Sequence, residues 1–548
     1  MVQFDAGEPG GGTTLSHWAV LPALTLGLGL TFWVARFVLV WFATPVASAY
    51  QESVITLALI AGRLTHVTGV LVFLLGLILL FVTRAYRLRW SDLDAGRNMR
   101  LLAIVMGTVL AWKFSTYGPN LYFGEWHLFD RVLLVALVPL LWWRPVAVVP
   151  FLIVLLGIQA QFRAVMPVYG WALESLLVQI LILVAVVTVV LPVVRRFTSL
   201  VRPSQQAVWI VLFSIFAANY WASGFDKLIT GWFVFDPVHF LLPAGYANGW
   251  LNWLDADTVA SIASGAGRFD VATRLLTGLF ECGAVLFLSS RRLAIWLTVG
   301  WILFHLGIMA ACGIFFWTWI LADAALILVL VRRGGVFASA LFNRRAFAVS
   351  VILIISSGYW LDPTVLRWYD SPVTYKFTFE GIGPSGNTYE LTPDFFSPND
   401  YPFRLSGFSY LVASPHSMLP VSFGATTNRD LAKRLRDVSS IQEAVAVESE
   451  LGQVRYDADR ADRLISFLSI TGMRSNRLSP ESAFPDWLRA PPSIWVPARG
   501  EVYDRQEPIA KINVTMTAWV FAGGQIEEVR STPVASVTIG DGERESTR

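Results

Sequence analysis

The sequence predicts an all-α domain that crosses a membrane many times, followed by a water-soluble α+β domain. The 548-residue chain is 55% hydrophobic and only 15% charged, with a mean hydropathy of +0.56, whereas soluble domains are about a quarter charged. After residue 360 the apolar runs shorten, and charged residues, Pro and Gly become more frequent. We therefore predict a flexible N-terminal segment at 1–17, a transmembrane domain at 18–360 and an extracytoplasmic α+β domain at 361–548.

The transmembrane prediction depends on apolar runs, because a helix of about 20 apolar residues crosses a bilayer with its backbone hydrogen bonds satisfied internally. Eleven runs are candidates: 18–44, 67–82, 101–112, 132–143, 146–159, 171–194, 207–221, 275–288, 293–311, 314–331 and 347–360. Several are shorter than a full span, so we expect nine to eleven transmembrane helices. The runs on either side of Arg144 and Pro145 have an alternative interpretation as one broken helix.

Arginine-rich loops predict the orientation, because short basic loops stay in the cytoplasm. If the runs alternate, four such loops lie on one side; they contain Arg84, Arg87, Arg89, Arg97 and Arg100; Arg195, Arg196 and Arg202; Arg291 and Arg292; and Arg332, Arg333, Arg344 and Arg345. The opposite connections are richer in Asp, Trp and Tyr. We therefore expect an integral, multi-pass membrane protein with a cytoplasmic N-terminus and with everything after Trp360 outside, in a periplasm, an exterior or a lumen.

The C-terminal domain shows both strand and helix patterns. Residues 374–379 and 511–517 alternate between apolar and polar side chains, which predicts strands. Residues 428–451 and 461–471 have helical spacing after plausible caps. A domain of roughly 180 residues is large enough to bury its own core. Its Ser and Asp residues form no nucleophile motif, so we assign it no chemistry.

Ionisable side chains within or near the apolar runs are functional candidates, because each costs about 2.5 to 3.5 kcal/mol on membrane insertion. They are Arg36, Arg63, His66, Lys113, Glu174, Lys227, Glu281, His305 and Asp323. Snorkelling to the interface is the alternative for Lys113, Arg63 and Glu174. For Glu281, His305 and Asp323, which sit well inside apolar runs, the alternative is a structural polar network between helices.

Several classes of site are not supported by the sequence. The two cysteines, Cys282 and Cys312, lie in apolar runs, which excludes a disulfide framework and a cysteine-ligated zinc site. The six histidines never occur twice in one run, which argues against haem and di-iron sites. No phosphate-binding loop is present. The net charge of +3 is small and the Lys and Arg residues do not cluster on one helical face, so we expect no nucleic-acid partner. From the positions of the Cys and His residues we also expect no metal site.

Two motifs resemble the vitamin K-dependent gamma-carboxylase family, also called the HTTM family. The first is residues 219–228, Asn-Tyr-Trp-Ala-Ser-Gly-Phe-Asp-Lys-Leu, followed by Trp232. The second is Phe-His-Leu-Gly-Ile at 304–308, followed by Gly-Ile-Phe-Phe at 313–316. Glu281 stands between them, where family members often have an acidic residue. The order and spacing of these features agree over residues 101–331.

The resemblance implies that Lys227 is the base that deprotonates vitamin K hydroquinone. Tyr220, Ser223 and Gly224 share its helical face and would leave room for a flat ring beside the amine. We predict Lys227, His127 and His305 as catalytic residues, and Tyr220, Ser223, Gly224, Trp232 and Glu281 as substrate-binding residues. The chain departs from the family at Asp226, where the carboxylase has a second lysine. About two additional apolar runs separate His127 from Lys227, and the C-terminal domain does not resemble the carboxylase's substrate-binding domain.

Three hypotheses on function follow. The first is a carboxylase-like membrane enzyme that uses Lys227 as a base on a lipid-soluble, quinone-like substrate, with a reduced quinone such as vitamin K hydroquinone as cofactor. The second is a non-catalytic membrane anchor, with Lys227 fixing a helix end at the interface, that presents the outer domain for assembly with a protein partner. The third is a small-molecule transporter, which Glu281 and Asp323 favour but the lack of an inverted repeat opposes. In each case the lipid bilayer is a partner.

Overall fold

The computed structural model describes residues 15–45, 54–93, 96–118, 120–165, 175–197, 201–332, 341–363, 368–406, 408, 411, 423–450, 455–478 and 484–540. Residues 1–14 of the predicted flexible segment, together with Glu174 and Arg333, lie outside the described residues. The side chains of Arg195, Arg196 and Arg202 are not described either.

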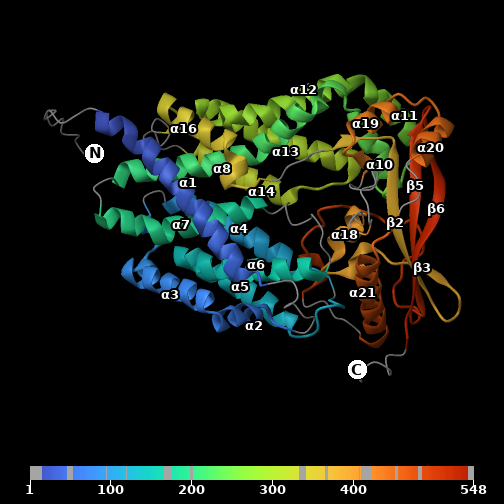
Figure 1. Cartoon of the computed structure of the whole chain (residues 1–548), viewed down its shortest axis with the longest axis horizontal. Helices are drawn as coiled ribbons and strands as arrows, with labels where there is room; N and C mark the ends of the chain where they lie inside the picture. The colour runs from blue at the N-terminus through green and yellow to red at the C-terminus, as the bar shows by residue number, and fades with distance from the viewer. Residues whose placement is uncertain are drawn as a thin grey trace.

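The described chain up to residue 360 is mainly helical. Its helices are α1 (Leu15–Ala43), α2 (Thr56–Ala61), α3 (Val67–Val82), α4 (Gly96–Ser115), α5 (His127–Trp143), α6 (Val148–Val165), α7 (Ser175–Phe197), α8 (Val201–Thr230), α9 (Trp232–Phe235), α10 (Leu241–Ala247), α11 (Ala256–Ala266), α12 (Asp270–Glu281), α13 (Arg291–Cys312), α14 (Trp317–Val331), α16 (Arg344–Ile355) and α17 (Ser357–Trp360). Most of these helices gather in one half of the molecule, whereas α10 and α11 lie beside the sheet of the other half (Figure 1). Every predicted apolar run overlaps a helix. The runs that flank Arg144 form two helices, α5 and α6.

Five helices in the described residues are long and apolar enough to cross a membrane: Val20–Ala43, Pro145–Val165, Gln205–Thr230, Ala256–Ser289 and Arg291–Cys312. A sixth is added if Thr56–Thr65 and Val67–Val82, which meet at a 106° bend, form one broken span. Apolar side chains are exposed on these helices, for example Phe37 (68%) on α1 and Leu275 (69%) on α12. Such apolar faces are typical of helices that contact lipid. The chain thus has the features of a membrane protein.

Helix α8 lies at the centre of the helical half and packs against α1, α7, α12 and α16. Its large side chains, including Trp209, Phe213 and Phe216, are fully buried. The helix runs to Thr230, beyond the predicted apolar run that ends at 221. Its last turns carry the candidate residues, and their charged side chains, Asp226 and Lys227, are buried.

The C-terminal half contains a four-stranded antiparallel sheet in the order β3-β2-β5-β6 (Figure 1). Its strands are β2 (Val373–Ile382), β3 (Thr388–Glu390), β5 (Lys511–Ala522) and β6 (Gln525–Thr538), and a smaller sheet pairs β1 (Tyr369–Asp370) with β4 (Ala425–Thr426). The helices of this half are α18 (Asp400–Leu405), α19 (Arg429–Arg436), α20 (Ile441–Ser449) and α21 (Ala458–Arg477). Both predicted strands are confirmed, and they pair with each other as β2 and β5. The helix predicted at 428–451 is two helices, because Ser440 caps the start of α20.

The two faces of the sheet pack against different parts of the chain. On one face, Val514 and Met516 of β5 join a core that includes Phe467 of α21. On the other face, Phe521 packs with Phe240 and with Val259 of α11. Helices α10 and α11 precede residue 361, so the helical half of the sequence supplies part of the cover of the sheet.

Residues 484–498 bind the C-terminal half to the ends of the helices. Trp112 Nε1 donates to the Leu488 carbonyl at 2.6 Å, and Lys113 Nζ donates to Ser493 Oγ at 2.7 Å. The backbone N–H of Phe315 donates to the Ser493 carbonyl, and the N–H of Trp495 donates to the Gly313 carbonyl. The two halves therefore meet through regular backbone pairing as well as side-chain contacts.

Candidate functional site

Lys227 and Glu281 form a buried ion pair where α8 meets α12. The Lys227 ammonium donates to both carboxylate oxygens of Glu281, at 2.6 and 2.8 Å. Both residues are buried, and the ammonium lies 5.2 Å from the centre of the Trp232 ring. Three residues predicted for the site thus come together here. The bidentate contact satisfies Glu281 inside an apolar helix, where an unpaired carboxylate would be costly.

Gly224 explains how α8 and α12 come so close. A Cβ atom at this position would lie 2.8 Å from Glu281 Cβ and 2.9 Å from the backbone nitrogen of Cys282. The absence of a side chain therefore lets Glu281 reach the last turns of α8. The space beside Gly224 that we expected to receive a flat ring is filled by Glu281 and Cys282. Ser223, the neighbouring predicted residue, is also buried.

Tyr220 and His305 belong to a second buried cluster, nearer the middle of α8. The Tyr220 hydroxyl donates to Asp323 Oδ2 at 2.6 Å, and its ring stacks on Trp301 with the centroids 3.9 Å apart. The His305 ring stacks on Phe316 at 4.8 Å and lies 5.7 Å from Tyr220. Asp323 and His305 are both buried. The second motif of the sequence therefore packs directly against the first.

Two carboxyl groups that the sequence did not single out for the site lie next to the Lys227 segment. Asp236 follows α9, and its Oδ1 accepts the backbone N–H of Asp370 in β1 at 2.9 Å. Both side chains are buried, and Asp236 Oδ2 and Asp370 Oδ1 have no hydrogen-bond partner among the described residues. Burial, and then the charge of Asp370, raises the pKa of Asp236, while burial raises the pKa of Asp370 to about 7. No pattern links these aspartates, because they are far apart in the sequence.

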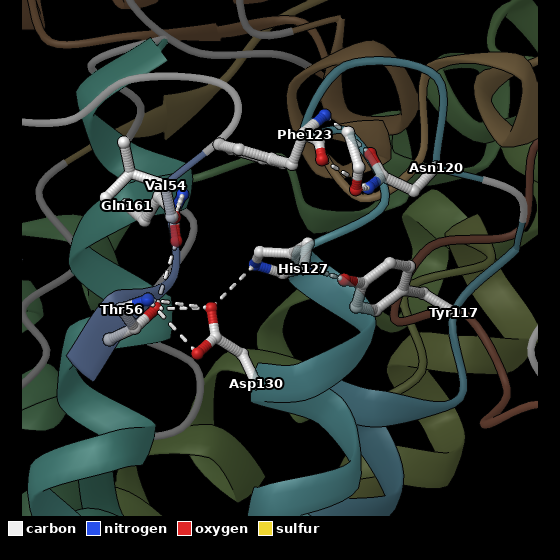
Figure 2. Close-up of polar contacts among 9 residues, drawn as sticks. Val54, Thr56, Tyr117, Asn120, Phe123, His127, Asp130 and Gln161 are labelled. Atoms are coloured by element: carbon white, nitrogen blue, oxygen red, sulfur yellow. Dashed lines mark hydrogen bonds and ion pairs between the residues drawn. The ribbon is translucent and has the colours of Figure 1, made fainter. Parts of the chain in front are cut away.

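His127 lies in a different part of the molecule, at the start of α5 (Figure 2). Its Nδ1 is 2.6 Å from the Tyr117 hydroxyl, its ring stacks on Phe123 at 5.0 Å, and its Nε2 is 3.9 Å from Asp130 Oδ2. No hydrogen bond, ion pair or ring contact joins it to Lys227 in the described part of the chain. The structure thus places one predicted catalytic residue apart from the others.

Asp130 is the centre of the polar network around His127. Figure 2 shows it facing Thr56, whose backbone N–H and hydroxyl both donate to Asp130 Oδ2 at 2.9 Å. The Thr56 hydroxyl also lies 3.0 Å from Gln161 Oε1, and Gln161 Nε2 donates to the Val54 carbonyl. The network ties the start of α2 to α5 and α6. It satisfies buried polar groups, as expected of a structural joint.

Three other ionisable residues predicted at membrane depth, Arg36, Arg63 and Lys113, have partners near helix ends. Arg36 pairs with Asp362 at 2.7 Å, and Arg63 donates to the Thr44 carbonyl at 2.8 Å. Lys113 reaches Ser493 in the C-terminal half. These contacts fit the interpretation that long side chains extend from the helices to polar groups at their ends.

Comparison with models of protein families, with curated proteins and with solved structures finds no match to this chain. The resemblance to the gamma-carboxylase family therefore depends only on the two motifs given above. Both motifs lie in the Lys227 and Tyr220 clusters.

Proposed function

We propose that the chain is a multi-span membrane enzyme in which Lys227 accepts a proton from a lipid-soluble hydroquinone. The observation that carries this proposal is the buried Lys227–Glu281 pair beside Trp232. The resemblance to the gamma-carboxylase family suggests the same lysine and the same class of substrate. The geometry adds Glu281, which can take a proton from the Lys227 ammonium and so leave a neutral, basic amine.

Glu281 provides a way to form a neutral amine inside the protein. Desolvation disfavours both charges of a buried pair, so the ion pair and the neutral pair are closer in free energy than they are in water. Proton transfer over the 2.6 Å contact gives a carboxylic acid on Glu281 and an amine on Lys227. The amine then accepts the hydroxyl proton of the hydroquinone. The O–H bond breaks, an N–H bond forms, and the substrate becomes a monoanion beside the new ammonium.

Exposed apolar side chains next to Lys227 suggest how the substrate would arrive. Phe225, Leu228 and Ile229, all on the last turns of α8, are more than two fifths exposed. A hydroquinone with an apolar tail could approach along these residues from the lipid. Its ring would then meet the Trp232 side of the ammonium, because Glu281 and Cys282 fill the Gly224 side.

Exposed aromatic residues at both ends of the helices suggest where the two membrane interfaces lie. Trp126, Trp253 and Tyr359 are exposed at the helix ends nearest the C-terminal half, and Trp143 and Trp296 are exposed towards the opposite ends. Trp and Tyr are enriched at both membrane interfaces. We infer nine to eleven spans between these two belts, with the C-terminal half outside.

The test uses the purified protein in lipid nanodiscs with vitamin K hydroquinone as the probe. The buffer is saturated with dioxygen, which oxidises the hydroquinone monoanion once it forms, and the rate of hydroquinone consumption is compared between the wild type, Lys227→Arg and the matched control Lys113→Arg. Arginine keeps the charge but does not deprotonate in proteins, so Lys227→Arg should lose at least tenfold in rate while Lys113→Arg retains it. Equal rates for Lys227→Arg and the wild type would exclude Lys227 as the base.

A second function, a membrane anchor for the outer half, is favoured by one observation. Helices α10 and α11 and residues 484–498 join the two halves over a broad contact. An anchor would need this contact but not a titrating Lys227. In a cellular assay, Lys227→Arg would then behave as the wild type, whereas changes at the contact would cause loss of function.

A further inference from the structure

We propose that one face of α19 binds the phosphate of an anionic phospholipid at the membrane interface, next to the end of α8. Arg429 and Lys433 contact the phosphate, and the acyl chains lie along α9 and α12. This inference rests on the placement of the helical half in a membrane and not on the reaction proposed for Lys227. It gives a binding role to a helix of the C-terminal half, to which the sequence assigned no chemistry.

Helix α19 lies over the turn between α8 and α9, where the helical half meets the C-terminal half (Figure 1). Gly231 forms this turn with a φ of +81°, and a Cβ atom there would lie 3.3 Å from Arg429 Nη2. Ala432 of α19 is buried in a cluster with Phe235 of α9. The candidate span Gln205–Thr230 ends at the same turn. The ends of spans lie at the level of the lipid headgroups, so α19 is held at that level.

Three cationic groups of α19 gather around the Phe235 ring. Arg429 Cζ is 5.4 Å from the ring centre, and Lys433 Nζ and Arg436 Cζ are each 6.0 Å from it. Residues four and seven positions apart share one face of a helix, and all three residues are exposed. Like charges that are gathered in this way repel one another. An anion bound among them would therefore be stabilised.

Two of these cations have no carboxylate partner. Arg436 pairs with Asp437 at 2.8 Å. In the part of the chain that the structure describes, neither Arg429 nor Lys433 forms an ion pair, and the neighbouring Asp430 forms none with them. A guanidinium offers a planar fork of donors that matches a phosphate, and an ammonium adds a compact charge beside it. The pair can thus bind one phosphate without breaking an existing contact.

Exposed apolar side chains lie next to the cationic face. Val234 of α9 is 77% exposed, and Leu275 and Leu279 of α12 are 69% and 59% exposed. The two helices touch, because a Cβ atom on Gly278 would lie 3.3 Å from the Phe233 ring. Apolar surface beside basic residues matches the two parts of an anionic phospholipid. A soluble phosphate or an acidic peptide would leave the apolar part uncovered.

A purely structural role would explain only part of the cationic face. A cation near the C-terminal end of a helix is favourable, which would account for Arg429 at the end of α8. It would not account for Lys433 and Arg436 on the same face. The binding of lipid therefore has to be measured directly, with variants that separate the two roles.

The test measures phospholipid binding to the full protein by native mass spectrometry from detergent. Phosphatidylglycerol, which is anionic, and phosphatidylcholine, which has no net charge, are added at equal concentrations. The wild type should bind phosphatidylglycerol more tightly. In Arg429→Gln/Lys433→Gln this preference should fall by about tenfold or more, because each cation near an anionic lipid contributes to the attraction. Lys433→Gln alone leaves Arg429 at the end of α8 and should lose about threefold or more.

The matched control removes the same charge from exposed positions outside this face. Arg434 pairs with Glu450 at 2.7 Å, and Arg477 lies on the last turn of α21. Arg434→Gln/Arg477→Gln should keep the preference of the wild type. The exchange Arg429→Lys/Lys433→Arg keeps both charges and should keep it as well.

Three results would overturn the proposal. They are an unchanged preference in Arg429→Gln/Lys433→Gln, an equal fall in the control, and displacement of the lipid by an equal concentration of glycerophosphoglycerol, the deacylated headgroup. The last result would mean that the apolar surface contributes nothing. The measurements contain no hydroquinone, so lipid binding can fail while hydroquinone is consumed, and it can hold if hydroquinone is not consumed.

Discussion

Glu281 holds the Lys227 ammonium with both of its carboxylate oxygens, at 2.6 and 2.8 Å, although Asp226 is next to the lysine in the sequence. Neighbouring residues on a helix point in different directions, whereas a residue on a facing helix can meet the side chain end to end. The resulting pair is buried on all sides.

Removal of one partner of this pair should destabilise the protein strongly. Glu281→Leu leaves an ammonium buried without a counter-ion, and the breaking of a buried pair costs about 3 to 5 kcal/mol. The double variant Lys227→Met/Glu281→Leu removes both charges and should recover much of that loss. Thermal unfolding in detergent measures both. If the single and the double variant lose equal stability, the loss in Glu281→Leu does not come from the unpaired ammonium of Lys227.

Gly224→Ala should force α8 and α12 apart. The added Cβ would meet Glu281 Cβ at 2.8 Å, and overpacking of this kind costs about 1 to 3 kcal/mol. Gly307→Ala on α13 is the matched control, because nothing lies within 4 Å of its added Cβ. The control should be neutral or slightly stabilising, since Ala favours the helix. Melting temperatures that fall equally in both variants would contradict the close approach at Gly224.

The stability of the protein should decrease from acid to neutral pH because of Asp370. Burial raises the pKa of this carboxyl from 3.8 to about 7. A raised pKa means that the protonated group contributes fully below about pH 4 and that this contribution is lost as the pH rises through about 7. The melting temperature of the wild type should therefore fall between about pH 4 and about pH 7 and level off above that range. Asp370→Asn should flatten this part of the profile; a profile with the same slope would assign the effect to other groups.

The outer half should be accessible from outside the cell. In a variant with Cys282 and Cys312 replaced by Ala, single cysteines are introduced at Glu527, which is exposed on β6, and at Ser91, which is exposed in an arginine-rich loop. A membrane-impermeant maleimide added to intact cells should label Glu527→Cys and leave Ser91→Cys unlabelled until the cells are opened. The reverse pattern would invert the topology.

The helices could be predicted from the sequence because an apolar run is a local signal. The strands β2 and β5 were likewise visible in the alternation of their side chains, since one face of each strand is buried in a common core. Strand β6 has a weaker pattern. It is an edge strand with many exposed side chains, and Pro533 lies opposite Thr515 at an irregularity in the ladder.

The remaining features depend on contacts between distant residues. Helices α10 and α11 are short, and the strands that they cover come much later in the sequence. The partnership of Asp236 with Asp370 has no local signature for the same reason. Lys227, Glu281, Tyr220 and His305 could be chosen because ionisable and aromatic residues stand out in an apolar helix. That His127 lies apart from Lys227 could be seen only in the three-dimensional structure.

The cover that α10 and α11 provide for the sheet has a consequence for biogenesis. These helices leave the ribosome long before β5 and β6 are synthesised, so their apolar surface stays open during the intervening translation. A chaperone would have a binding window in that interval. The outer half expressed from residue 361 alone would lack this cover and expose Phe521 to water. Its solubility should improve when residues 241–266 are supplied as a separate polypeptide.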